Sequence, residues 1–110
     1  MPQWSLMSDS LPGKTYNAKQ LRSIGHRLKP VVTVAQRGLT DNVRKEIERA
    51  LADHELIKVS VKSGTRQERQ TTIEKICQEC DAQLIQAVGH IALIFRRNDH
   101  PDPRLSNLLR

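Results

Sequence analysis

Two cysteines and four histidines are the first residues of this chain to consider as metal ligands or as thiol and imidazole nucleophiles. Cys77 and Cys80 have the CxxC spacing of half a zinc site, but no second CxxC or HxxxH pair accompanies them. Both cysteines also fall on the apolar stripe of a predicted helix, which favours a place in the core. The histidines lie in four different local contexts, at His26, His54, His90 and His100. We therefore expect no metal site and no other cofactor.

Carboxylates and short motifs give no better support for catalysis. Glu46, Glu48 and Glu74 fall on the solvent-facing sides of predicted helices, where charged side chains are usually solvated. The sequence has no P-loop, no dinucleotide-binding glycine pattern and no nucleophile elbow. We predict that the protein is not an enzyme.

Positive charge is in excess and is unevenly distributed along the 110 residues. Lysine and arginine number 18 against 12 acidic residues, which gives a net charge of +6 and a pI near 9.8. Residues 1–39 hold six of these cations and one acid, and residues 57–69 hold four cations and one acid. Such segregation favours a nucleic acid or an anionic surface as partner over a charge that serves solubility alone.

Aromatic residues are too few to form a surface on which bases could stack. The chain has one tryptophan, one tyrosine and one phenylalanine, at Trp4, Tyr16 and Phe95. The first two lie in or near the N-terminal segment, and Phe95 is expected in the core. Modes of RNA binding that stack bases on sheet aromatics are therefore disfavoured, and contacts with phosphates are expected instead.

The residues AQRGLT, Ala35 to Thr40, form a short polar turn between a predicted strand and a predicted helix. Such a turn directs unpaired backbone N–H groups and the positive helix end outward, which suits a phosphate. Arg37 adds a full charge, and Gly38 removes a side chain that would block close approach. The alternative is an ordinary turn with a solvent-facing arginine. Basic residues on both sides favour the phosphate site: Arg22, Arg27, Lys29, Lys58, Lys62, Arg66 and Arg69.

Hydrophobic periodicity predicts seven elements in the order helix, strand, helix, strand, helix, strand, strand. Helices are expected from Asn17 up to Pro30, from Thr40, and after the turn at 63–65 to about Asp81. Strands are expected at 31–34, 56–62, 84–88 and 91–95, the last two joined by Gly89-His90. Strands connected through helices are most simply parallel, and the final pair is antiparallel. We predict an α/β two-layer open-faced sandwich with a four-stranded mixed sheet, whose second face is open if all three helices share the first.

A chain of this length is expected to form one domain. We assign residues 1–14 to a flexible N-terminal arm, 15–97 to the folded domain and 98–110 to an extended C-terminal tail. The N-terminal residues lack the features of a secretory signal, and two cysteines without a disulfide pattern indicate a reducing compartment. We expect a cytoplasmic protein.

Three sequence blocks, LKPVV, RGLT and HELIKV, followed by the hairpin AVGHIALIFRR, resemble the CRM domain (chloroplast RNA splicing and ribosome maturation), most closely its stand-alone bacterial YhbY-like form. The resemblance covers about residues 18–97. It implies a fold similar to the C-terminal domain of bacterial translation initiation factor three, RNA binding, and association with precursors of the large ribosomal subunit. It also implies a KH-like GxxG loop at Ala35 to Gly38, where alanine replaces the first glycine. The family's basic positions match Arg22, Lys29, Lys58 and Arg96.

These observations lead to one preferred function and two alternatives. We predict an RNA-binding protein that associates with precursor large-subunit rRNA in pre-ribosomal particles and assists ribosome assembly. The residues expected to contact RNA are Arg22, Lys29, Gln36, Arg37, Gly38, Thr40, Lys58, Lys62, Arg66 and Arg96. The main alternative is an adaptor in ribosome assembly whose basic surface meets an acidic protein partner. A DNA-binding domain is less favoured, because no helix-turn-helix pattern is present.

Overall fold

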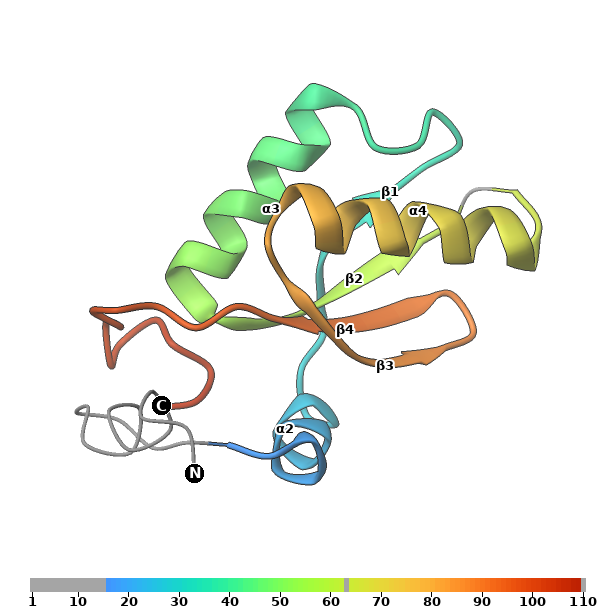
Figure 1. The fold of residues 1–110 in the computed structure, drawn as a ribbon. Helices are drawn as coiled ribbons and strands as arrows, with labels where there is room; N and C mark the ends of the chain where they lie inside the picture. The colour runs from blue at the N-terminus through green and yellow to red at the C-terminus, as the bar shows by residue number, and fades with distance from the viewer. Residues whose placement is uncertain (1–15, 63, 110) are drawn as a thin grey trace, which may run out of the picture.

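The computed structural model describes residues 16–62 and 64–109, and the N-terminal arm predicted at 1–14 lies outside them. Seven elements follow one another in the predicted order (Figure 1). They are α2 (Ala18–Gly25), β1 (Pro30–Val34), α3 (Asp41–His54), β2 (Leu56–Val61), α4 (Arg66–Glu79), β3 (Gln83–Val88) and β4 (Ile91–Phe95). Side chains cap all three helices at the residue before the first turn, at Asn17, Thr40 and Thr65. The predicted α/β class is confirmed.

The four strands form one mixed sheet in the order β1-β2-β4-β3. β1 and β2 are parallel, because α3 carries the chain back between them, and the other two pairings are antiparallel. Gly89 begins the tight turn of the β3–β4 hairpin with a φ of 58°. The parallel pairing places the C-terminal ends of β1 and β2 at the same edge of the sheet, where the AQRG turn begins.

One face of the sheet carries the main core, and α3 and α4 cover it (Figure 1). On β2, Ile57, Val59 and Val61 are fully buried on this face, as their alternation predicts. From the two helices, residues at helical spacing pack against them, including Ile47, Leu51, Ile73 and Ile76. Cys80 is also fully buried in this core, and Cys77 packs against it.

α2 packs on the opposite face, so the helices do not all share one side of the sheet (Figure 1). Leu21 of α2 forms a second core with Leu56 and Leu93. Gly25 allows this close approach, because a Cβ at that position would lie 2.5 Å from Leu93 Cδ2. The face expected to be open is thus covered at one end by α2 and remains accessible over the rest.

The segment after β4 folds back onto the domain and is not the extended tail that its prolines suggest. The Ser106 hydroxyl is buried and donates a hydrogen bond to Glu55 Oε1 at 2.7 Å. The backbone N–H of Asn107 donates to the carbonyl of His54 at 3.0 Å. Tyr16 donates from its hydroxyl to the Leu108 carbonyl at 3.2 Å, and Leu108 packs against the second core. These contacts join the two ends of the described chain.

Candidate nucleic-acid interface

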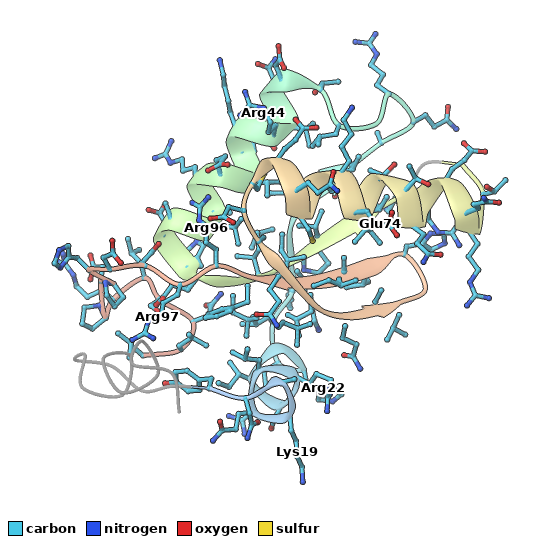
Figure 2. The ribbon with its side chains drawn as sticks, viewed as in Figure 1. Lys19, Arg22, Arg44, Glu74, Arg96 and Arg97 are labelled. Carbon is cyan, nitrogen blue, oxygen red and sulfur yellow. The ribbon has the colours of Figure 1, made fainter. Side chains whose placement is uncertain are left out.

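Residues 16–40 contain no carboxylate and five cations: Lys19, Arg22, Arg27, Lys29 and Arg37. The amphipathic α2 buries Leu21 and Gly25, so its basic residues face solvent, and Figure 2 shows Lys19 and Arg22 extending away from the sheet. The absence of acids from this segment removes the usual partners of surface cations. An exposed helix of one charge sign creates a local positive potential.

Two adjoining hollows lie where α2 meets the uncovered part of the sheet. The first, about 480 Å³, is lined by Lys19, Arg22, Ser23, His26, Arg27 and Gln86. The second, about 340 Å³, is lined by His26, Lys58, Gln86, Val88, Ile91 and Leu93. His26 and Gln86 border both hollows, so Arg22 and Lys58 belong to one surface. Lys29 is exposed and directly precedes Pro30, which pairs with Lys58 across β1 and β2, so we include it as a neighbour of this surface.

We call this region the α2-side surface, defined by Lys19, Arg22, His26, Arg27, Lys29 and Lys58. Four ion pairs occur among the described residues: Arg49–Asp53, Lys75–Glu79, Arg96–Glu48 and Arg104–Asp102. None of them involves a residue of the α2-side surface. Among the described residues, no carboxylate therefore has to be displaced before these cations bind an anionic partner.

The turn between β1 and α3 has a defined backbone conformation. The N–H of Gly38 donates to the Ala35 carbonyl at 2.9 Å, and Gly38 has a φ of 76°. Ala35 is outside the left-handed region, because the positive φ values of non-glycine residues in residues 16–62 and 64–109 belong to Glu55 and Asp81. Alanine in place of the first family glycine therefore causes no backbone strain here, and the glycine that the turn needs is Gly38.

Arg37 is exposed at the tip of this turn, and its side chain makes no hydrogen bond or ion pair within the described part of the chain. Thr40 begins α3, and its hydroxyl accepts a hydrogen bond from the N–H of Val43 at 3.3 Å. Asp41 occupies the first turn of α3, where its carboxylate interacts favourably with the positive helix end. An incoming phosphate would meet repulsion from this carboxylate as well as attraction from Arg37.

Lys62 and Arg66 lie at the same edge of the sheet as this turn. The N–H of Lys62 donates to the Val34 carbonyl at 2.9 Å, which fixes the end of β2 beside the end of β1. Arg66 is the first residue of α4, which begins shortly after β2. We call Arg37, Lys62 and Arg66 the turn-edge group. It lies at the other end of β1 from α2 (Figure 1), so the predicted cations form two groups and not one patch centred on Arg37.

Comparison with known proteins agrees with this fold. The model of the CRS1/YhbY (CRM) domain matches residues 14–96. The chain belongs to the CRM domain family. The matched region contains both basic groups and ends at the last residue predicted to contact RNA, Arg96.

Several relatives of this CRM domain are named as RNA-binding proteins. A probable RNA-binding protein of Pseudomonas aeruginosa is 47% identical over 92 residues, which cover 84% of this chain and 88% of that protein. An RNA-binding protein of Haemophilus influenzae is 41% identical, with 77% and 89% covered. The solution structure of a hypothetical protein of Staphylococcus aureus, described as a candidate RNA-binding protein, has a TM-score of 0.66 and 28% identity, and 76% of this chain and 91% of that chain are covered.

Arg96 of this CRM domain is engaged inside the fold, unlike the other cations predicted to contact RNA. Its Nη1 lies 2.6 Å from Glu48 Oε2 and 2.9 Å from the Cys80 carbonyl oxygen, and its Nη2 donates to the Glu48 carbonyl at 3.2 Å. The side chain is 22% exposed and lies between α3 and the end of α4 (Figure 2). This placement does not fit the predicted contact of Arg96 with RNA, because its guanidinium donors already have acceptors.

The two cysteines of the CRM domain are free thiols. Burial, followed by the neighbouring Glu48 carboxylate, raises the pKa of Cys80 to about 11, and burial also raises the pKa of Cys77. Both thiols are therefore protonated at neutral pH and poorly nucleophilic. Residues 16–62 and 64–109 hold no group of three metal-binding side chains, and none of the helices found there is long and apolar enough to cross a bilayer.

Sequence reasoning missed three residues that the structure adds to the interface: Lys19, His26 and Gln86. The first two could have been found, because they lie three residues before and four residues after Arg22 and so share its side of a helix. Gln86 carried no such signal, since only the folded hairpin brings β3 under α2.

Proposed function

We propose that this CRM domain binds RNA in the cytoplasm, mainly through the α2-side surface and additionally through the turn-edge group. The observation that carries the proposal is the cluster of Arg22, His26 and Lys58 around two adjoining hollows whose lining residues include no carboxylate. Neutralising phosphates releases their condensed counterions, which is the dominant sequence-independent contribution to affinity for nucleic acid. The names of the relatives support RNA as the polyanion.

We expect phosphate contacts and RNA shape to supply the binding energy, since the aromatic side chains of the described residues are engaged in packing. Tyr16 is held by Leu108, and Phe95 packs in the second core with Leu93. The AQRG turn contributes the guanidinium of Arg37, while the carboxylate of Asp41 weakens phosphate binding at the helix end beside it. We therefore rank the α2-side surface above the turn in its contribution to affinity.

The partner that we propose is precursor rRNA of the large ribosomal subunit, with the protein acting as an assembly factor in the pre-ribosomal particle. Ribosomal RNA offers structured helices and junctions whose phosphates can contact separated basic groups at once. Crosslinking the protein to RNA in cells and sequencing the sites tests this step. Sites concentrated in precursor large-subunit rRNA are expected, whereas sites scattered over messenger RNAs would refute the ribosomal role and leave RNA binding intact.

Charge-neutralising variants test the binding surface directly. Arg22→Gln, Lys58→Gln and their combination are compared with Arg49→Gln, which removes the same charge from an exposed position on α3 whose side chain is 87% exposed. Affinity for a structured rRNA fragment is measured by fluorescence anisotropy between about 50 and 200 mM salt. Each phosphate contact that a variant removes is expected to reduce the slope of log affinity against log salt by about 0.7 to 0.9. Equal slopes for the α2-side variants and Arg49→Gln would contradict the proposal.

An adaptor that binds an acidic protein remains the alternative, and the exposed tail residues Leu105 and Leu109 form one apolar surface that it could use. These side chains are only 39% and 37% exposed, and Leu108 between them is turned into the second core. The patch is small by comparison with stable protein interfaces. Association with ribosomal particles that survives nuclease treatment and is lost in Leu105→Ser/Leu109→Ser would favour the adaptor over the RNA-binding protein.

A further inference from the structure

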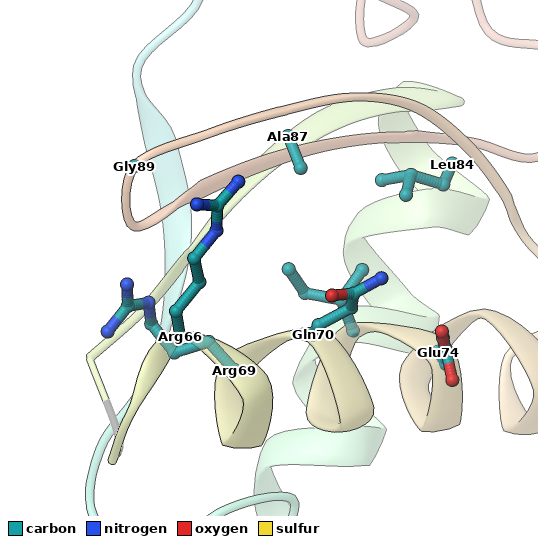
Figure 3. Close-up of a pocket in the computed structure, with 8 residues that line it drawn as sticks. Arg66, Arg69, Gln70, Glu74, Leu84, Ala87 and Gly89 are labelled. Carbon is teal, nitrogen blue, oxygen red and sulfur yellow. The ribbon is translucent and has the colours of Figure 1, made fainter.

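A groove of about 510 Å³ separates α4 from the β3–β4 hairpin, and the turn-edge residue Arg66 stands at its mouth (Figure 3). Its lining combines an apolar floor and wall with a few polar groups. The residues are Arg66, Arg69, Gln70, Ile73, Glu74, Leu84, Ala87 and Gly89. This volume and this mixture are typical of sites for small planar ligands.

An irregularity in β3 creates the apolar wall. The pairing of β3 with β4 shifts register between Leu84 and Gln86, which leaves Ile85 as an extra residue. Leu84 and Ala87, three positions apart, consequently both line the α4 side, while Ile85 packs in the second core on the other face. Figure 3 shows Leu84 and Ala87 pointing toward the helix.

The helix opposite this wall, α4, has polar side chains at positions that face the apolar residues of β3. Gln70 and Glu74 are four residues apart on α4, and both line the groove. Leu84 remains 43% exposed as a result, although the neighbouring Ile73 is only 6% exposed. An apolar wall that faces an amide and a carboxylate across open space is poor packing but a suitable arrangement for a ligand with a flat face and a polar edge.

Two arginines add anion-binding capacity at the same end of the groove. Arg66 reaches from the start of α4 toward the hairpin (Figure 3). Arg69 donates from Nη1 to the Gly64 carbonyl at 3.1 Å, but its Nε is buried and, among the described residues, has no hydrogen-bond partner. The guanidinium of Arg69 is thereby held beside Arg66 in the lining of the groove. A nucleotide would fit the arginines, the apolar wall and the polar pair together. Its phosphate would lie near Arg66, its base would lie against the apolar wall, and the polar edge of the base would face Gln70 and Glu74.

The carboxylate of Glu74 distinguishes between bases, because it only accepts hydrogen bonds. Guanine presents two adjacent donors on its Watson–Crick edge, N1–H and the N2 amino group, and can pair with both carboxylate oxygens. Adenine, cytosine and uracil each present fewer adjacent donors there. The amide of Gln70 can donate to guanine O6, and single-stranded or bulged RNA offers such an edge to a protein.

We propose that the groove between α4 and the β3–β4 hairpin holds one unpaired base of the bound RNA and prefers guanine. The inference rests on the proposed function. It adds recognition of a base to a binding surface that would otherwise contact only phosphates. Glu74 and Gln70 read the base edge, Leu84 and Ile73 contact the base face, and Arg66 joins the groove to the turn-edge group.

The test uses five RNA hairpins that are identical except for one bulged position, which is G, A, C, U or abasic. Anisotropy titrations of the full chain are expected to give the tightest binding for bulged G, by at least about fivefold over the other bases. Glu74→Gln is expected to abolish the preference for G, measured as the ratio of the affinities for the bulged-G RNA and the abasic RNA, so that a general effect of the removed charge cancels. Glu79→Gln, which removes the same charge from the same helix at a position outside the groove lining, is the matched control and is expected to retain the preference.

Leu84→Ala provides a second, uncharged test of the same groove. It is expected to lower affinity for all four base-containing RNAs toward the abasic value, with the thermal melt monitored to confirm folding. Equal affinity of the native protein for all five RNAs, or a preference that Glu74→Gln leaves intact, would overturn the inference. Failure of the proposed function has a different signature, namely weak binding of all five RNAs with no response to Arg22→Gln.

Discussion

Replacing Arg96 by methionine should lower the free energy of unfolding of this domain and leave its affinity for RNA unchanged. The Arg96 guanidinium pairs with the Glu48 carboxylate at 2.6 Å and donates to the carbonyls of Cys80 and Glu48 at 2.9 and 3.2 Å. It thereby links the residue that follows β4 to α3 and to the end of α4. Methionine keeps an unbranched apolar stem but leaves these acceptors without their donor.

The expected cost follows from the burial of the pair. Breaking a fully buried ion pair costs about 3–5 kcal/mol, and exposed pairs contribute about 0–1 kcal/mol. With side-chain exposures of 22% for Arg96 and 36% for Glu48, and two additional hydrogen bonds to carbonyls, a loss of about 2–3 kcal/mol is expected. At roughly 4 °C per kcal/mol for a domain of this length, the melting temperature should fall by about 8–12 °C.

Thermal and urea unfolding of Arg96→Met measures this loss, with Arg97→Met at the exposed neighbouring position as control. Arg97→Met removes the same charge and should shift the melting temperature by less than about 2 °C, as is usual for surface changes. Well below the melting temperature, Arg96→Met should bind RNA as the native protein does. An unchanged melt together with an RNA affinity reduced as in Arg22→Gln would refute the structural role and restore Arg96 to the binding surface.

Three further substitutions and one pH dependence follow from the backbone and the cores. Gly25→Ala should cost about 1–3 kcal/mol of unfolding free energy in urea, since the new methyl group would lie 2.5 Å from Leu93 Cδ2. Gly38→Ala should cost about 1–2 kcal/mol through its φ of 76° alone, whereas Ala35→Gly should change stability by less than about 1 kcal/mol. The free energy of unfolding should fall as pH rises above about 9, because native Cys80, with a pKa of about 11 from burial and a nearby carboxylate, keeps a proton that the unfolded thiol loses near 9.0. Cys80→Ala should weaken that decline, and an identical pH profile would show that other groups cause it.

Local sequence patterns were sufficient to predict the elements of this fold but not the side of the sheet on which each helix packs. The alternation of Ile57, Val59 and Val61, the cap at Thr40 and the Gly89 turn are each determined within a few residues. α2 has the same apolar period whichever face it covers. Its true position depends on Gly25 meeting Leu93 from a strand almost seventy residues later, which no local pattern encodes.

The roles of charged residues were predictable only where their neighbours in sequence are also their neighbours in space. The basic character of Arg22 and Lys29 persists in the fold because residues 16–40 contain no acid that could approach them locally. Arg96 also looks like a free cation in sequence, but Glu48 is brought to it from a different helix. The folding of the segment after β4 onto the domain was unpredictable for the same reason. It depends on the hydrogen bond from Ser106 to Glu55, which lies fifty-one residues earlier in the sequence.

The separation of the two basic groups favours a polymeric ligand over a small anion. Lys29 and Arg37 stand at opposite ends of the five-residue β1, which is roughly 16 Å long. A single phosphate or nucleotide cannot reach both ends, whereas a structured RNA repeats its phosphates along a continuous path. Removing the charges of one basic group should therefore reduce the affinity for a long RNA in proportion to the number of phosphates that the group binds. The affinity for a dinucleotide should change only when the group that it contacts is removed. The spacing of the two basic groups thus suits a ligand that extends along β1 from one end of the sheet to the other.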